Sequence, residues 1–141
     1  MEEKVEVTIE VILHATEDEK KIFDSFFELF EIKEEEFAKE NLIGHYTNPI
    51  TFLRVKIIKN RAKSFIKKLV SELPADQLAE IINNIENRVQ DSMLYLRLGK
   101  QALVQRNITL QENDAIKVKI YTPVYSKKDT AKIYTNLFTP S

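Results

Sequence analysis

Residues 5 to 14 read VEVTIEVILH, and this stretch decides the fold class because apolar and polar side chains alternate through most of it. A period of two is typical of a β-strand that has one face in the core and the other in water. The first face holds Val5, Val7, Ile9, Val11 and Leu13, and the second holds Glu6, Thr8, Glu10, Ile12 and His14. We therefore predict that the chain begins with a half-buried strand.

The same alternation returns in three later segments, namely 50–59 (ITFLRVKIIK), 93–98 (MLYLRL) and 115–121 (AIKVKIY). Each segment puts branched apolar side chains on one face and cations or aromatic rings on the other, which predicts three more strands. A short edge strand with Phe37, Leu42 and Ile43 would be a fifth, and pairing after Gly99 would extend towards Val104. We expect a sheet of four to five strands.

Apolar residues at spacings of three and four predict helices between these strands. Thr16-Glu17-Asp18-Glu19 is a capping box in front of a stripe that runs from Ile22 to Phe30. Asn60 is expected to cap a second helix, and Pro74 to start a third that continues through Ile85 and towards Val89. Residues 126–138 are expected to form a C-terminal helix that is either docked on the body or frayed.

The order of these elements predicts an α+β two-layer domain with a mostly antiparallel, four- to five-stranded sheet and helices packed on one face. The chain has 141 residues, 43% of them hydrophobic, and contains only two glycines. Such a composition favours a folded chain over a disordered one, and the length suits one core. We expect residues 1–141 to form a single domain.

The chain contains no cysteine, which excludes disulfides, thiolate metal sites and cysteine nucleophiles. The first ten residues, MEEKVEVTIE, are acidic and alternating, unlike a signal peptide, and no apolar run reaches the length of a membrane span. These features predict a cytoplasmic protein without a membrane partner.

Catalytic residues, metal ligands and cofactors are not expected. The two histidines, His14 and His45, lie in different segments and outside any metal-binding spacing. Gly44 and Gly99 are too few for a phosphate-binding glycine loop. A small hydrolase or nuclease remains an alternative only if both histidines and acidic residues converge in space.

The charge of the chain is divided unevenly along the sequence, although the net charge is only −1. Acidic residues dominate positions 1–40, whereas positions 41–70 contain basic residues and no acidic ones. The basic set is Arg54, Lys56, Lys59, Arg61, Lys63, Lys67 and Lys68. This segment is where a polyanion would be attracted, and the alternative is a lysine-rich helix that only aids solubility.

A second candidate surface is the polar face of the predicted sheet. If alternation holds, this face carries Phe52, Arg54, Lys56, Tyr95, Arg97, Lys117, Lys119 and Tyr121. Cations interleaved with aromatic rings suit single-stranded nucleic acid, because phosphates take the charge and bases stack on the rings. An ordinary solvated face or a dimer contact would use the same residue types.

The candidate RNA-binding residues come from both surfaces and from the loop 44–49, with Lys100 added from the end of the motif Tyr95 to Gln101. They are Arg54, Lys56, Lys59, Arg61, Lys63, Lys67, Arg97, Lys100, Lys117, Lys119, His45 and Tyr46. His45 and Tyr46 are included because they could stack on an unpaired base beside the basic segment.

Four motifs give the chain a resemblance to a known family. They are His14 to Glu19, Gly44 to Ile50, Tyr95 to Gln101, and Asp114 to Ile120. Through them, and along most of its length, the chain resembles the archaeal exosome-associated RNA-binding proteins, a family ascribed a fold like that of the double-stranded-RNA-binding domain. It departs from the pattern at Thr47, where glycine is usual, and at Gly99, where an acidic residue is usual.

The resemblance implies a non-catalytic RNA-binding accessory factor whose partners are RNA and proteins of the exosome or of ribosome biogenesis. An alternative function is a protein-interaction or dimerisation module that uses the sheet face and the acidic first 40 residues. Both a monomer and a homodimer are compatible with these expectations.

Overall fold

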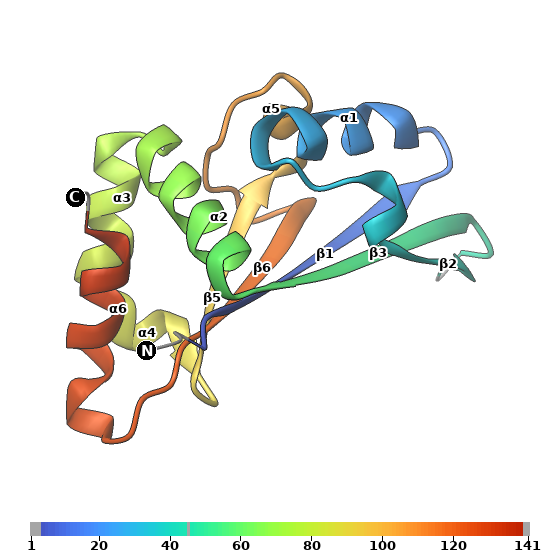
Figure 1. The fold of residues 1–141 in the computed structure, drawn as a ribbon. Helices are drawn as coiled ribbons and strands as arrows, with labels where there is room; N and C mark the ends of the chain where they lie inside the picture. Colours follow the sequence, from blue (N-terminus) through green and yellow to red (C-terminus); the bar gives the residue numbers. More distant parts are fainter. Residues whose placement is uncertain (1–3, 45, 140–141) are drawn as a thin grey trace.

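The sheet has six strands in the part of the chain that the structure, a computed structural model, describes: residues 4–44 and 46–139. Their order is β2-β3-β1-β6-β5-β4, and all neighbours are antiparallel. The strands are β1 (Glu6–His14), β2 (Ala38–Ile43), β3 (Pro49–Ile58), β4 (Val89–Gln90), β5 (Met93–Gly99) and β6 (Ala115–Tyr121). The α+β class is confirmed, and Figure 1 shows the open sheet beside its helices.

Strand β1 lies inside the sheet, between β3 and β6, and sets which side chains are buried. Ile9 faces Val55 on one neighbour and Val118 on the other, and all three are buried. Because side chains on a strand alternate, this register puts the apolar residues of β3, β5 and β6 on the same face as those of β1. The alternation predicted for these four strands is confirmed.

Six α-helices and two short 3₁₀ turns complete the described part of the chain. The helices are α1 (Glu19–Phe30), α2 (Lys59–Glu72), α3 (Ala75–Asn83), α4 (Ile85–Arg88), α5 (Lys100–Val104) and α6 (Thr130–Phe138), and the turns are Glu34–Glu36 and Lys127–Asp129. Their buried apolar residues join those of the strands in a single core cluster. Within it the Phe30 and Phe65 rings, from α1 and α2, lie 4.3 Å apart.

The predicted number of four to five strands is wrong, because two edge strands bring it to six. Strand β2 is the edge strand that was expected near Leu42. All its residues are exposed, so its sequence does not need the alternation of apolar and polar residues that marks a half-buried strand. Strand β4 has only two residues and pairs with Met93 and Leu94 of β5. It starts at Val89, where the third predicted helix was expected to continue.

Three predicted boundaries also differ. The chain does not stay extended after Gly99 but turns into α5, a helix that ends at Val104. The side chain that caps α1 is Asp18, which accepts a hydrogen bond from the Lys20 N–H at 3.0 Å, instead of Thr16. Asn60 lies inside α2, whose cap position is Ile58.

The C-terminal helix α6 is docked. Tyr134 and Phe138 are fully buried, and the Tyr134 hydroxyl lies 3.0 Å from the Ser92 carbonyl oxygen and 3.2 Å from that of Ile120. Burial raises the pKa of this hydroxyl above its ordinary value. The hydroxyl therefore ties α6 to the sheet in its neutral form.

Replacing this hydroxyl should weaken the docking. We expect Tyr134→Phe to lower the free energy of unfolding by about 1 kcal/mol, since a buried hydrogen bond is lost. Because the folded pKa is raised, stability from this group is full below the unfolded pKa of 10.0 and is lost as the pH rises from there through the folded pKa. Urea titrations at pH 7 and 10.5 check both points, with the exposed Tyr125→Phe as a control that should change nothing.

Candidate functional site

The antiparallel register lines up charged residues in rows across the sheet face opposite the core. In one row Arg54, Glu10, Lys117 and Arg97 are successive neighbours on β3, β1, β6 and β5. The next row is Lys56, Thr8, Lys119 and Tyr95. We call the five cations of these rows, Arg54, Lys56, Arg97, Lys117 and Lys119, the cationic face.

Carboxylates of β1 neutralise part of the cationic face. Glu10 lies 3.2 Å from the Lys119 ammonium and 3.6 Å from Arg54, and Glu6 lies 2.9 Å from Lys56. Lys117, which is exposed, forms no ion pair or hydrogen bond with the described residues. Arg97 donates only to a neutral group, the Glu112 carbonyl oxygen, at 3.2 Å. The β5–β6 half of the face therefore keeps unneutralised positive charge.

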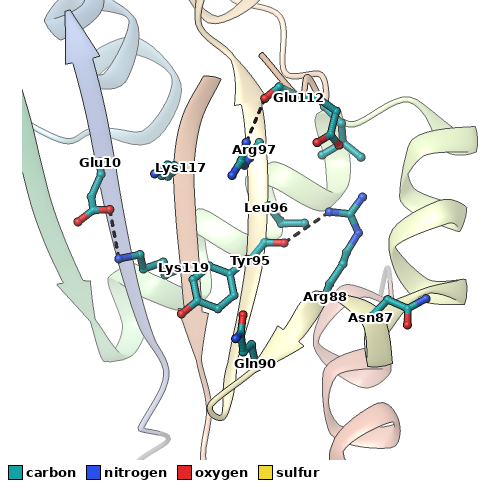
Figure 2. A pocket seen from close by; sticks show the side chains of 11 residues that line it. Glu10, Asn87, Arg88, Gln90, Tyr95, Leu96, Arg97, Glu112, Lys117 and Lys119 are labelled. Atoms are coloured by element: carbon teal, nitrogen blue, oxygen red, sulfur yellow. Dashed lines mark hydrogen bonds and ion pairs between the residues drawn. The ribbon is translucent and has the colours of Figure 1, made fainter. Parts of the chain in front are cut away.

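A hollow of about 540 Å³ opens over this half of the sheet. In Figure 2 the Tyr95 ring lies between the Lys117 and Arg97 side chains at one end and Gln90 at the other. Asn87 and Arg88, at the end of α4, form one wall. The hollow is lined by Glu10, Asn87, Arg88, Gln90, Tyr95, Leu96, Arg97, Leu110, Glu112, Lys117 and Lys119.

Hydrogen bonds hold the arginines of the hollow in place. Arg88 reaches the Tyr95 carbonyl oxygen at 3.4 Å and the Glu80 carboxylate at 2.5 Å, so its charge is compensated. Arg97 is tied to the loop that precedes β6 through Glu112. These contacts fix the positions of donors before any ligand arrives, which reduces the entropy cost of binding.

The cations predicted on the second helix belong to a different surface. Helix α2 packs on the apolar face of β1 and β3, away from the cationic face (Figure 1). Lys63, Lys67 and Lys68 line a groove of about 930 Å³ between α2 and α6. The basic segment 41–70 is thus divided between the two sides of the sheet.

Two further members of the candidate set lie on α2. Arg61 pairs with both carboxylate oxygens of Glu36, and this hydrogen bonding lowers the pKa of the Glu36 carboxyl. Lys59 begins α2, and its N–H donates to the Val5 carbonyl oxygen at 2.9 Å. Acidic residues of the N-terminal region therefore pair with cations on both sides of the sheet.

Lys100, one of the predicted RNA-binding residues, is buried. It is 1% exposed, and its ammonium lies 2.7 Å from the Ile12 carbonyl oxygen and 2.8 Å from both Glu17 and Asp114. A lysine can be buried when its charge is paired and its donors are satisfied, as they are here. We remove Lys100 from the candidate RNA-binding residues.

The same place is the one cluster of potential metal ligands in the described residues. Ligand atoms of His14, Glu17 and Asp114 lie within 4.8 Å of one another, but the Lys100 ammonium contacts both carboxylates. The positive charge that such a cluster attracts is thus supplied by Lys100. His14 is exposed at its margin, with Nε2 3.9 Å from Asp114.

Gly44 and residues 46–48 lie at the tip of the β2–β3 hairpin, which extends beyond the helices in Figure 1. Tyr46 is 84% exposed there, and a hydrogen bond of 2.6 Å from the Gly44 N–H to the Asn48 carbonyl oxygen closes the turn. Thr47 adopts φ 60°, the backbone region that favours glycine. His45 lies outside the described residues.

Sequence reasoning missed Asn87, Gln90 and Glu112, which line the hollow. They come from α4, β4 and a loop, so no periodic pattern connects them to β5 and β6. Of the predicted residues, the structure brings Arg97, Lys117 and Lys119 together in the hollow. Arg54 and Lys56 lie on the same face, two strands away.

Comparison with known proteins links residues 6–122 to a family described as RNA binding. The RNA-binding protein PAB1135 of Pyrococcus abyssi is 27% identical, over 90% of this chain and 87% of its own. An uncharacterized protein of Methanocaldococcus jannaschii is 26% identical over 92% of this chain and 95% of its own. The crystal structure of a DUF54 protein from Archaeoglobus fulgidus matches this chain with a TM-score of 0.80 at 28% identity. The match covers 95% of this chain and 99% of that protein's chain.

Replacing Lys100 tests whether the buried cluster stabilises the fold. We expect Lys100→Met to lower the free energy of unfolding by roughly 3 kcal/mol, because Glu17 and Asp114 would keep their charges without a counter-ion. Urea denaturation measures the change. The exposed helix lysine in Lys67→Met is the matched control and should stay within about 0.5 kcal/mol.

The double variant Lys100→Met with Glu17→Gln should lose less than the sum of the single variants, because Glu17→Gln also removes the orphaned carboxylate. Strict additivity, or a Lys100→Met chain as stable as the control, would show that the cluster contributes little to folding.

Proposed function

The chain belongs to this RNA-binding family, and we propose that it binds RNA through the cationic face of its sheet. The observation that carries the proposal is the row in which Lys117 and Arg97 stand side by side on β6 and β5 without a carboxylate partner. Like charges on directly opposed residues of neighbouring strands repel each other, and a phosphate bound between the two side chains would relieve this repulsion.

The electrostatics of the whole molecule are consistent with a local site. The net charge of −1 gives little general attraction for a polyanion. The cationic face, however, holds five cations, and the carboxylates near them are those of Glu6 and Glu10 on β1, Glu40 on β2 and Glu112 beside the hollow. A phosphate backbone that approaches this face meets an excess of positive charge, which supports binding there and not over the surface at large.

We propose further that the protein is a non-catalytic, cytoplasmic accessory factor in RNA processing. The resemblance to exosome-associated proteins supports this role, with exosome or ribosome-biogenesis proteins as partners. The name of the Pyrococcus abyssi relative supports RNA as the ligand. No helix in the described ranges is both long and apolar enough to span a bilayer.

A second candidate function is protein docking on the other side of the sheet. The groove between α2 and α6 has an apolar floor that includes Ile66, Val70 and Leu137, with Lys63 and Lys67 beside it. Such a groove suits an acidic, aliphatic segment of a protein partner. Size-exclusion chromatography without RNA would favour this function, or dimerisation, if it showed self-association or a shift with a partner.

Removing charge from the cationic face should weaken RNA binding. If about five phosphates are contacted, the affinity of the wild-type chain should fall on the order of a hundredfold between 50 and 200 mM salt. Replacing Arg97 and Lys117 by Gln should reduce RNA affinity on the order of tenfold. The slope of log affinity against log salt concentration should become shallower by about one for each phosphate contact that is lost. Filter binding across a salt series measures both.

The matched control replaces Lys63 and Lys67 by Gln, which removes the same charge from the α2 side of the sheet. We expect its affinity and salt slope to match the wild type. A greater loss in this control than in the Arg97 and Lys117 variant would move the site to α2, and binding that ignores salt would contradict phosphate recognition.

A further inference from the structure

We infer that the hollow beside Tyr95 takes one unpaired nucleotide, so that the RNA recognised by this chain is single-stranded at that point. The inference rests on the proposed RNA binding and specifies its substrate class. The volume of about 540 Å³ falls in the range of small-ligand sites, and the lining offers an aromatic ring, amides and cations together. A nucleotide needs these three kinds of group.

The shape of the hollow favours an unpaired base over a duplex. Bases inside an RNA helix are stacked and paired, and proteins contact such a helix mainly through its phosphates and 2′-hydroxyls. A concave site on a sheet can receive a base only if that base is turned out of the stack. Tyr95 as a residue is 37% exposed and lines the hollow, where a base can stack on its ring.

Groups around Tyr95 match the parts of a nucleotide. Asn87 and Gln90 carry both donors and acceptors, as the edge of a base requires. Lys117 and Arg97, one residue row further along the sheet, offer a place for the phosphate. Glu10, the cross-strand neighbour of Lys117, and Glu112, beside Arg97, also line the hollow, at the same end as these two cations. Because neither Lys117 nor Arg97 forms an ion pair with a carboxylate in the described structure, we place the phosphate over these two side chains and the base against Tyr95.

The register keeps these groups in position without a ligand. Tyr95 is the direct cross-strand neighbour of Lys119, whose ammonium is held 3.2 Å from Glu10. The carbonyl oxygen of Tyr95 accepts a hydrogen bond from Arg88, and this bond connects β5 to α4 beside the ring. A stacking platform on a paired strand loses little freedom when a base arrives.

Comparing single-stranded and duplex RNA tests the inference. The probes are a fluorescein-labelled oligouridine decamer and a blunt duplex of the same length, titrated at 100 mM salt by fluorescence anisotropy. We expect the wild type to prefer the single strand, and Tyr95→Ala to weaken that binding on the order of tenfold, in line with the loss of one stacked base. Tyr95→Phe keeps the ring and should bind like the wild type.

Two controls separate binding from folding. Tyr125→Ala removes an equally large ring that is 93% exposed on a loop, and should leave affinity unchanged. Thermal melting of each variant shows whether the sheet is intact. As a measurement on the unaltered chain, photocrosslinking of a 5-iodouridine decamer should attach RNA to the peptide that contains Tyr95.

The outcomes distinguish this inference from the proposed function. Equal or tighter binding of the duplex, with Tyr95→Ala unchanged and Arg97 and Lys117 still required, would overturn the unpaired-nucleotide site and leave RNA binding by the cationic face intact. Crosslinks confined to α2 or α6 would overturn both the nucleotide site beside Tyr95 and the assignment of RNA binding to the cationic face. A wild-type chain that binds neither probe would overturn RNA binding itself.

Discussion

The pairing of β1 with antiparallel neighbours on both sides is the constraint on which the rest of the structure depends. Ile9 has to face Val55 and Val118 at once, and a shift of β1 by one residue would bring Glu6 and Glu10 into the core. The cost of burying unpaired charges excludes that register. The alternation of side chains on β1 therefore fixes that of β3, β6 and β5. Helix α2 packs on the face that is apolar on all four, whereas the end of α4 forms a wall of the hollow on the other face.

The same alternation of side chains creates the charge pattern of the opposite face. Acidic residues of β1 lie between basic residues of β3 and β6, so Glu10 is shared by Arg54 and Lys119. Towards β5 no further carboxylate lies in the row, and Lys117 and Arg97 remain side by side. A surface that is locally positive thus arises in a chain whose net charge is −1, from strand order and not from composition.

Alternation in the sequence was enough to predict the core strands and to place Arg97, Lys117 and Lys119 on one face. It could not predict the hollow, because Asn87, Gln90 and Glu112 reach it from elements whose position depends on tertiary packing. It gave only a short edge strand where β2 runs from Ala38 to Ile43, because β2 is exposed along its whole length, and it gave no sign of β4, which is too short to show a period. The division of the segment 41–70 between two sides of the sheet needed the position of α2.

Lys100 shows why local sequence cannot separate a structural cation from a binding one. Its partner Glu17 lies 83 residues away, in another of the motifs on which the family resemblance rests, and Asp114 comes from a third. In this chain the three motifs therefore meet in an ion cluster around a buried lysine, which concerns the fold and does not by itself indicate a ligand. Lys117 is the opposite case, because it is exposed and lacks a protein partner in the described structure. A charge already satisfied inside the protein has little to gain from RNA, whereas Lys117 can gain a phosphate, and this difference directs the search for function to β5 and β6.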